Sequence, residues 1–268
     1  MQIDSAQNQH VKLFRSLAQS KHRRETGLFA LEGRRLIAEA VRARADMLWA
    51  AYSPEHFVGP EEDQLLGELM RSGLELHEMG PRALTAMTHT ESPPGIVAVA
   101  KIPAPPTDLA ATLPERAWLL GLWELRDPGN MGTMIRTAHA LGGAAVVAVG
   151  GCVDFYDPKV VRASAGSLLH LPLVKVHNLY ALRDSLAAWQ ASLVTAAMSA
   201  EQACDEADYP ARTVLLVGSE AHGLPEEVEV AAQLQVRIPM PGGAESLNAA
   251  VAAGIIAFQV ARQAMPRD

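Results

Sequence analysis

Short apolar strands alternate with helices over the carboxy-terminal half of the chain, and this alternation limits the fold more than any other feature. Such a pattern favours a mostly parallel sheet with helices on both faces. Taken alone, it indicates a doubly wound, unknotted α/β fold, because knots are essentially absent from proteins. Strands are expected at 118–123, 144–149, 173–176, 193–197, 213–217 and 235–238, and helices at 131–141, 158–169, 179–190 and 247–263.

The amino-terminal part predicts a smaller α/β domain. Helices are expected near 8–19 and 33–44, and strands near 28–31, 47–51 and 95–101, with room for one more strand within 70–80. A Pro-rich, extended stretch follows at 102–107. The sequence therefore predicts a first domain at 1–104, a linker at 105–114 and a second domain at 115–268.

Composition places the chain among globular proteins. With 268 residues, of which 49% are hydrophobic, it can bury a full core in one or two domains. The longest apolar run, 140–153, is shorter than the ~18–20 residues that span a bilayer, and the first ten residues do not resemble a secretory signal. The two cysteines, Cys152 and Cys204, form no CxxC motif. We expect no membrane contact, no metal site and a reducing cytoplasm.

The charge distribution is uneven. The net charge is −7, which by itself argues against a nucleic-acid partner. Residues 1–44, however, hold nine Lys and Arg against four acids, which leaves +5 there and −12 for the rest of the chain. A local basic face can bind phosphates even on an acidic protein. A solvated, charged helix surface explains the same residues, and composition alone favours that second interpretation.

Three segments rich in glycine or polar residues lie in the alternating half. They are 127–132, followed by Arg136 in a helix, then 218–223 after an apolar strand, and 238–248 before the last helix. Parallel strands of an open α/β sheet end at one edge, where such proteins bind ligands. Glycine leaves backbone N–H and C=O groups open to close approach. No GxGxxG, GxxxxGK[ST] or HExxH motif occurs, so any nucleotide-type ligand is held in another way.

In this order, the three segments resemble the motifs of the SpoU (TrmH-type) RNA ribose 2'-O-methyltransferases of the SPOUT class, over about residues 117–262. The pairing of GSEAHGL at 218–224 with IPMPGGAESLN at 238–248 makes the resemblance specific. The amino-terminal part resembles the small α/β (L30e-like) substrate-binding domain often attached to these enzymes. That likeness rests on Asn8-x-x-Val11-Lys12, Lys21-x-Arg23-x-Glu25-x-Gly27-x-Phe29, Glu32-Gly33-Arg34-Arg35-Leu36 and Pro94-Gly95-Ile96-Val97-Ala98-Val99.

The resemblance implies a carboxy-terminal trefoil knot, S-adenosylmethionine as cofactor, and a homodimer in which the partner subunit completes the active site. The cofactor would lie against Gly218, Gly223, Ile238, Met240 and Leu247. For Ile238 and Leu247, packing in the protein core is the alternative that the residues themselves favour.

The reaction implied is methyl transfer to a ribose 2'-hydroxyl, with Arg136 as the central residue. Guanidinium is essentially always protonated, so a phosphate anchor that orients the hydroxyl is favoured over a base. Asn130 would hold Arg136 or the ribose, and Glu220 would fix the loop or Arg136. Ser246 and Asn248 would orient the target nucleotide. Equally open from the residues are a turn role for Asn130 and a helix cap at Ser246.

RNA contacts are expected mainly from the basic amino-terminal segment. Arg162 shares one helix face with Lys159, and an RNA contact and a surface salt bridge are both open for it. His139, one turn past Arg136, is interpreted as incidental. The residues predicted to bind RNA are Lys12, Lys21, Arg23, Arg34, Arg35 and Arg162.

Two functions from different classes remain. The first is a cytoplasmic ribose methyltransferase that acts on ribosomal RNA, with transfer RNA as the second substrate. The second is a non-catalytic RNA-binding or ribosome-assembly factor that kept the fold.

Overall fold

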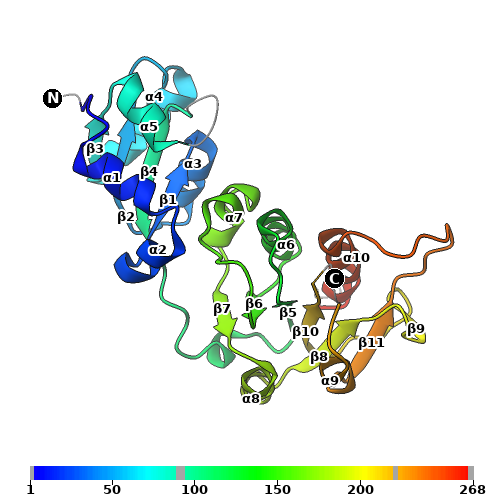
Figure 1. Ribbon diagram of the computed structural model, residues 1–268. Coiled ribbons are helices and arrows are strands. Elements are labelled where there is room, and N and C mark those ends of the chain that lie inside the picture. Colours follow the sequence, from blue (N-terminus) through cyan, green and yellow to red (C-terminus); the bar gives the residue numbers. More distant parts are fainter. Residues whose placement is uncertain (1–2, 89–93, 220–222, 265–268) are drawn as a thin grey trace. The chain divides into compact units, whose positions relative to one another are not determined.

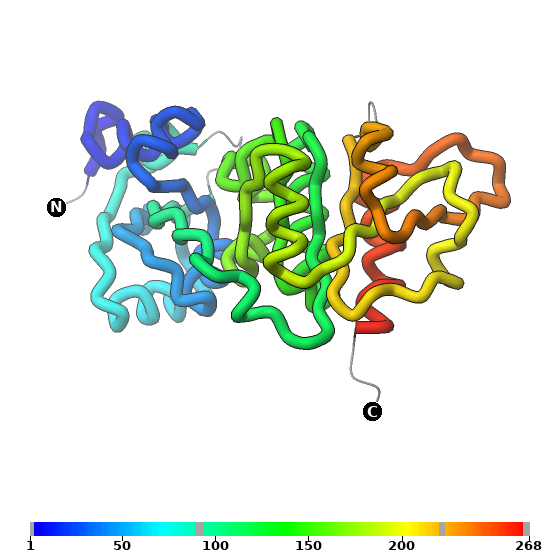
Figure 2. Tube along the Cα trace, turned by 90° about the horizontal axis from the view of Figure 1, so that it is seen from below, coloured from blue at the N-terminus to red at the C-terminus, as the bar shows by residue number. Residues whose placement is uncertain are grey.

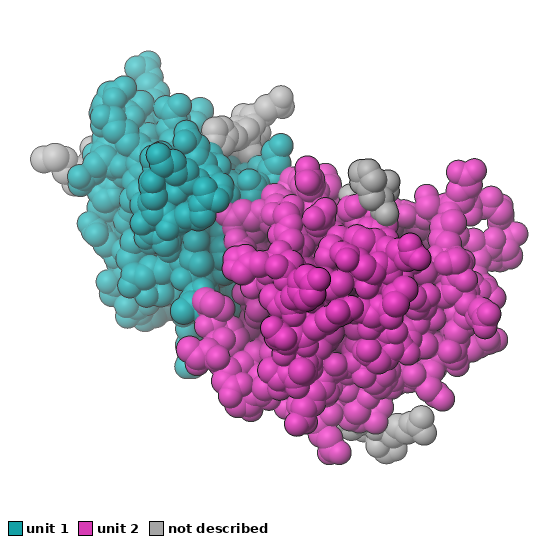
Figure 3. Space-filling model, turned by 60° about the horizontal axis from the view of Figure 1, so that its bottom comes forward, with its two compact units in different colours: residues 1–104, 156–169 teal, residues 105–155, 170–268 magenta. Residues whose placement is uncertain are grey.

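The computed structural model describes residues 3–88, 94–219 and 223–264, and the chain forms two compact units. Unit 1 comprises residues 1–104 and 156–169, and unit 2 comprises 105–155 and 170–268 (Figure 3). The predicted second domain thus includes a short segment, 156–169, whose contacts lie with unit 1.

Unit 1 contains a four-stranded sheet in the order β1-β4-β2-β3 (Figure 1). Strand β4 (Ile96–Lys101) runs antiparallel to β1 (Leu28–Glu32) and to β2 (Met47–Tyr52), and β2 runs parallel to β3 (Glu75–Glu78). All four strands lie in the regions expected from sequence. The helices of this unit are α1 (Gln9–Ser16), α2 (Ser20–Thr26), α3 (Arg34–Arg42), α4 (Pro60–Arg71), α5 (Pro81–Met87) and α7 (Pro158–Ala163), with a 3-10 turn at Ser167–Leu169.

The core of unit 1 forms where α1 and α5 cover the sheet. Val11, Phe14 and Leu17 pack with Trp49 and Val97. Three helices of unit 1, α2, α4 and α5, were not expected from sequence, and for α4 and α5 a signal was present. These two helices each begin with a proline at the first position, after a glycine, and proline is favoured there because its missing N–H has no partner to lose. The Gly-Pro pairs at 59–60 and 80–81 were therefore usable start signals.

Unit 2 contains a seven-stranded sheet in the order β7-β6-β5-β10-β8-β11-β9. Every strand pair identified in it is parallel, which confirms the expected mostly parallel α/β fold. Strand β5, which lies between β6 and β10, is buried along its whole length, as parallel strands covered on both faces are. The strands are β5 (Ala117–Trp123), β6 (Ala145–Val149), β7 (Leu173–Val176), β8 (Ser192–Ala196), β9 (Gln202–Ala203), β10 (Arg212–Val217) and β11 (Leu234–Arg237).

The helices of unit 2 are α6 (Pro128–Ala140), α8 (Leu179–Trp189), α9 (Glu226–Val230) and α10 (Ala249–Ala264), with a 3-10 turn at Ala110–Thr112. Asn178 caps α8, because its side chain accepts a hydrogen bond from the N–H of Ala181. Strand β9 and helix α9 are short and were not expected. The end of the expected linker is packed, since Leu109 and Leu113 lie in the core of this unit.

The helix predicted over 158–169 ends earlier than expected. Helix α7 stops at Ala163, and Ala165 and Gly166 follow with positive φ angles of 49° and 91°. Two consecutive left-handed residues cannot continue a right-handed helix. The start was predicted correctly, because Asp157 caps α7 and Pro158 occupies its first position.

The loops that follow β10 and β11 lead to the region of interest. In Figures 1 and 2 the segment 239–247, drawn in orange, loops outward before α10. Among the described helices, none is long and apolar enough to cross a membrane.

Candidate active site

The carboxyl ends of β8, β10 and β11 open into a cavity of about 530 Å³. This volume lies in the range of sites that hold drug-sized ligands. Because the three strands are parallel, their ends meet at one edge of the sheet, as the sequence pattern predicted. The cavity lining includes all five residues expected to hold a cofactor, namely Gly218, Gly223, Ile238, Met240 and Leu247.

Gly218 lies in the loop after β10, where the backbone approaches that of Gly223 closely. A Cβ atom at this position would lie 2.3 Å from the carbonyl carbon and oxygen of Gly223. A bridge between Ser219 and Gly223 closes the same loop. Gly223 has a φ of +63° and open space around its own Cβ position. The backbone thus requires glycine at both positions. Gly218 allows the close approach, and Gly223 adopts the left-handed conformation.

The cavity has an apolar face and a polar end. Ile238, Met240 and Ile256 supply apolar surface, and Leu247, with 39% of its side chain exposed, is not part of the closed core. Ser246 and Asn248 supply polar groups. This lining suits a flat heterocycle held between aliphatic side chains with its polar edge against backbone groups. S-adenosylmethionine fits that description and would supply the methyl group.

Helix α6 brings the first motif to the third. Asp127 caps the helix by accepting a 2.7 Å hydrogen bond from the N–H of Asn130. The side chain of Asn248 then donates a 3.1 Å hydrogen bond from Nδ2 to Oδ1 of Asn130. These two residues are 118 positions apart in sequence. The contact unites segments that the sequence analysis could relate only through resemblance.

Asn248, not Ser246, caps the last helix. Its Oδ1 accepts hydrogen bonds from the N–H groups of Ala250 at 2.9 Å and Val251 at 3.2 Å. The helix cap considered as an alternative for Ser246 does not form, because α10 begins at Ala249. Ser246 is exposed and lines the cavity, which leaves its hydroxyl available to a ligand.

Arg136 is exposed on α6, and it does not occur among the described residues that line the cavity. Its helix instead borders an apolar groove of about 550 Å³, whose lining includes Asn130, Asn248, Val251, Ile255 and Phe258. Asn248 lines both the cavity and the groove. Glu220, the remaining catalytic candidate, lies outside the described residues.

Sequence reasoning missed one wall of the cavity. Ala196, Ala197 and Met198, at the end of β8, line it beside the two glycine-rich loops. The available signal was the strand end itself, because β8 pairs with both β10 and β11 in parallel.

His139 was interpreted as incidental, yet its ring stacks on His170 with centroids 4.7 Å apart and an angle of 5° between the ring planes.

The cations expected to bind RNA differ in their surroundings. Lys12 and Arg35 are exposed, and no side-chain partner for either is found in the part of the chain that the structure describes. Lys21 lies 3.8 Å from Glu25, and Arg34 contacts both Glu61 and Glu62. Arg162 lies 3.5 Å from Glu32, so the salt-bridge alternative considered for it is present.

Arg23 has a different environment from the other cations. Its side chain is 1% exposed, and its guanidinium is engaged by two backbone carbonyls and by Asp157. A buried guanidinium cannot reach an RNA phosphate without leaving these partners. The structure therefore gives Arg23 an internal role in place of the RNA contact expected from sequence.

Comparisons with known proteins agree with this arrangement. Residues 117–258 match the SpoU rRNA Methylase family, and residues 8–98 match the MRM3-like substrate binding domain. The chain therefore belongs to the SpoU rRNA methylase family, whose members are RNA methyltransferases.

Particular relatives resemble the chain over nearly its whole length. It is 32% identical to the 23S rRNA (guanosine(2553)-2'-O)-methyltransferase RlmP of Bacillus subtilis, over 97% of this chain and 98% of that protein. It is 33% identical to the 23S rRNA (uridine(2479)-2'-O)-methyltransferase of Streptomyces viridochromogenes, over 97% and 91%. The AdoMet-bound rRNA methyltransferase of Sinorhizobium meliloti superposes with a TM-score of 0.84 at 29% identity, over 99% of both chains.

Proposed function

We propose that this protein transfers the methyl group of S-adenosylmethionine to a ribose 2'-hydroxyl in ribosomal RNA. The observation that carries the proposal is the cavity at the ends of β8, β10 and β11, lined by all five expected cofactor residues and joined to α6 through Asn248 and Asn130. Full-length similarity to enzymes named as 23S rRNA 2'-O-methyltransferases supports ribosomal RNA as the substrate. Transfer RNA is the second candidate, because other relatives carry the name tRNA/rRNA methyltransferase.

The chain's own residues align the hydroxyl and hold the phosphate. A sulfonium has a good leaving group, so positioning supplies much of the rate. Arg136 anchors a substrate phosphate through its planar donor set and orients the hydroxyl. Asn130 and Asn248 fix the adjacent backbone, and Ser246 binds the target nucleotide. Glu220 is assigned to holding the loop or Arg136.

A second copy of the chain completes this site. Val251, Ile255 and Phe258 recur along α10 at helical spacing, and they are 51%, 37% and 50% exposed. An exposed apolar stripe bordering a groove favours a protein contact. Arg136 lies on the helix beside that groove and outside the cavity of its own chain, so a homodimer would bring the partner's copy of this arginine toward the cofactor.

Family membership supports the remaining assignments. Residues 1–104 act as the RNA substrate-binding domain, with 105–114 as the link to the methyltransferase domain. Lys12, Lys21, Arg34, Arg35 and Arg162 contact RNA. The methyltransferase domain carries the trefoil knot of its class. The enzyme acts in the cytoplasm, a location that its two cysteines, which form no CxxC motif, support.

The test is to incubate the protein with labelled S-adenosylmethionine and with unmodified ribosomal or transfer RNA, and then to identify the nucleosides by mass spectrometry. A new 2'-O-methyl nucleoside that disappears in Arg136→Ala supports the proposal and names the RNA. Cofactor binding without transfer to either RNA would direct the search to precursor RNA or ribosomal particles. Absence of cofactor binding would favour the assembly-factor alternative.

The dimer is tested separately by light scattering on the purified protein. Ile255→Asp places a carboxylate in the apolar stripe and is expected to yield monomer with intact secondary structure and lost methyl transfer. The control is Arg262→Asp, which introduces the same carboxylate at an exposed position on the last turn of the same helix and is expected to leave the dimer intact. A wild-type monomer with full activity would contradict the proposed dimer.

A further inference from the structure

The connection between β6 and β7 belongs to unit 1 although it joins two strands of unit 2. These strands are neighbours in the parallel sheet, and α7 lies in the crossover between them. Residues 156–169 group with unit 1, while Phe155 and His170 group with unit 2. The methyltransferase sequence match, 117–258, thus includes a segment that helps to build the substrate-binding unit.

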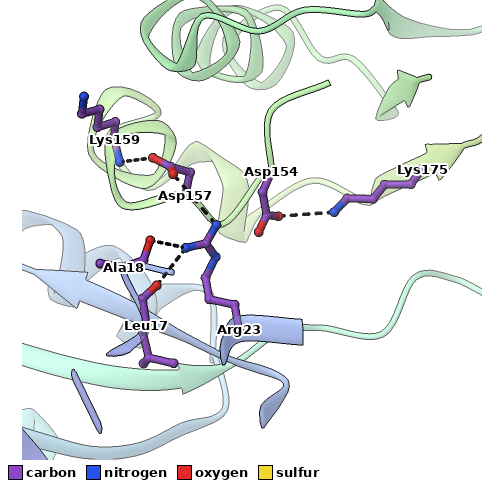
Figure 4. Close-up of polar contacts among 7 residues, drawn as sticks. All are labelled: Leu17, Ala18, Arg23, Asp154, Asp157, Lys159 and Lys175. Carbon is purple, nitrogen blue, oxygen red and sulfur yellow. Dashed lines mark hydrogen bonds and ion pairs between the residues drawn. The ribbon is translucent and has the colours of Figure 1, made fainter. Parts of the chain in front are cut away.

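Arg23 is the buried centre of this arrangement (Figure 4). Its Nη1 donates hydrogen bonds to the carbonyl oxygens of Leu17 at 2.8 Å and Ala18 at 3.0 Å, and its Nη2 lies 3.9 Å from Oδ2 of Asp157. A buried guanidinium is stable only when it is both paired and hydrogen-bonded. Here two carbonyl oxygens accept its hydrogen bonds, and the carboxylate of Asp157 supplies the opposite charge. The other carboxylate oxygen of Asp157, Oδ1, caps α7 by accepting from the N–H of Lys159 at 2.9 Å.

Contacts along the rest of the segment fix it within unit 1. At the start of the segment, the ring centroids of Tyr156 and Phe29 lie 4.9 Å apart. In α7, Arg162 pairs with Glu32 at 3.5 Å. Near its end, Gly166 lies against α3 so closely that a Cβ atom would approach that of Glu39 to 2.7 Å. The segment is therefore held at its beginning, middle and end.

Two exposed cations flank the pair formed by the buried Arg23 and the half-buried Asp157. Arg24 follows Arg23 on α2, and Lys159 follows the cap of α7 by two residues. Both side chains are exposed, and neither has a side-chain partner in the part of the chain that the structure describes. In Figure 4 the side chain of Lys159 points away from the Arg23–Asp157 pair. Because Arg23 and Asp157 are in contact, the helix ends that carry these two cations are held together.

We infer that α7 is part of the RNA-binding surface of unit 1. In this arrangement Arg24 and Lys159 contact backbone phosphates, and Arg23 and Asp157 are positioning residues that hold α7 against α2. The inference rests on the proposed function, since it assigns part of the substrate contact of the same enzyme. This role also explains why Arg23, a basic residue of the amino-terminal motif, is buried. Arg23 holds α2 and α7 together, and its neighbour Arg24 is exposed on the surface that they form.

The experiment uses the full-length protein and the RNA that the wild type methylates. RNA affinity is measured over a series of salt concentrations for Arg24→Ala, Lys159→Ala and the double variant. Each single change is expected to weaken binding by roughly threefold and to lower the slope of log affinity against log salt by about one. Both residues are exposed, so the fold is expected to tolerate their loss.

The positioning pair is tested with Asp157→Asn. Asparagine retains the cap on α7 but removes the charge that faces Arg23. We expect a higher KM for RNA with unchanged kcat and unchanged S-adenosylmethionine affinity, and recovery with Asp157→Glu, which restores the charge. The matched control is Asp154→Asn, which breaks a 3.3 Å ion pair with Lys175 inside unit 2 and is expected to leave the KM for RNA unchanged.

Two results would overturn the inference. One is a double variant, Arg24→Ala with Lys159→Ala, that binds RNA with the wild-type salt slope. The other is an Asp157→Asn variant whose KM for RNA moves no more than that of Asp154→Asn. Both require a wild type that methylates RNA, so they differ from failure of the proposed function, in which the wild type itself transfers no methyl group.

Discussion

The cavity of unit 2 and the charged surface of unit 1 were predicted with different success. The cavity is built from strand ends and glycines, and all five residues expected to hold the cofactor line it. The charged surface consists of long side chains. Several of those expected to bind RNA are buried or paired with acids in the structure. Arg23 is buried, Arg34 contacts Glu61 and Glu62, and Arg162 pairs with Glu32.

The difference has a physical cause. The cavity is formed by backbone features, such as a glycine with a left-handed conformation or the end of a strand. A few neighbouring residues of the sequence are enough to indicate each of these features. The environment of a lysine or arginine depends on which acid the fold brings near it. Glu32 and Arg162 are 130 positions apart, and no local pattern relates them.

The largest expected effect comes from placing a side chain at Gly218. In Gly218→Ala the new Cβ would meet the backbone of Gly223 at 2.3 Å, so the loop has to move. We expect loss of detectable S-adenosylmethionine binding, with strain of about 1–3 kcal/mol in the free energy of unfolding. Calorimetric titration and thermal unfolding measure the two quantities.

The matched control for this change is Gly242→Ala. A Cβ atom there has nothing within 4 Å, and the backbone conformation is an ordinary one. This variant is expected to bind the cofactor as the wild type does. Equal binding by the Gly218 and Gly242 variants would mean that the cavity is not the cofactor site.

The next effect in size concerns Arg136. Arg136→Ala is expected to lower turnover by about 10²-fold, the usual cost of removing a charged group that acts on the reacting centre. S-adenosylmethionine affinity should be unchanged, because the role proposed for Arg136 is to hold a phosphate of the RNA and not the cofactor. Arg136→Lys keeps the charge but loses the planar donor set, so it separates general attraction of phosphate from bidentate anchoring. Full recovery by lysine would contradict the anchoring role.

An intermediate effect is expected at Asn248, whose side chain has two roles. Asn248→Asp keeps an acceptor for the N–H groups of Ala250 and Val251 but cannot donate to Asn130. Turnover should fall by about tenfold while the melting temperature stays near that of the wild type. Asn248→Ala removes both roles and should also lower the free energy of unfolding by about 1 kcal/mol through the lost cap. Equal turnover in Asn248→Asp and the wild type would show that the contact with Asn130 is not needed for the reaction.

The sequence was sufficient for the motifs and for most elements of unit 2, though not for the short β9 and α9, and it was not sufficient for the contacts that join them. It could not reveal that Asn248 would cap α10 in place of Ser246, because the two candidates are two residues apart and both can cap a helix. It also could not reveal that 156–169 groups with unit 1, since a crossover helix ordinarily covers its own sheet. The first fact depends on where α10 begins, at Ala249, and the second on contacts between residues far apart in sequence, such as that of Arg23 with Asp157.

The smallest expected effect concerns Arg34 and Arg35, and it tests whether the contacts of a cation in the structure decide its part in RNA binding. Arg34 and Arg35 are adjacent and were assigned the same role from sequence, yet Arg34 is engaged by Glu61 and Glu62 while Arg35 is exposed. A phosphate has to compete with two carboxylates for Arg34, whereas Arg35 offers its charge directly. We therefore expect Arg35→Ala to weaken RNA binding by roughly threefold and to lower the salt slope by about one, and Arg34→Ala to change both much less. A larger loss from Arg34→Ala than from Arg35→Ala, at equal thermal stability, would mean that the carboxylates yield Arg34 to the RNA and that exposure in the free protein does not predict which cations bind it.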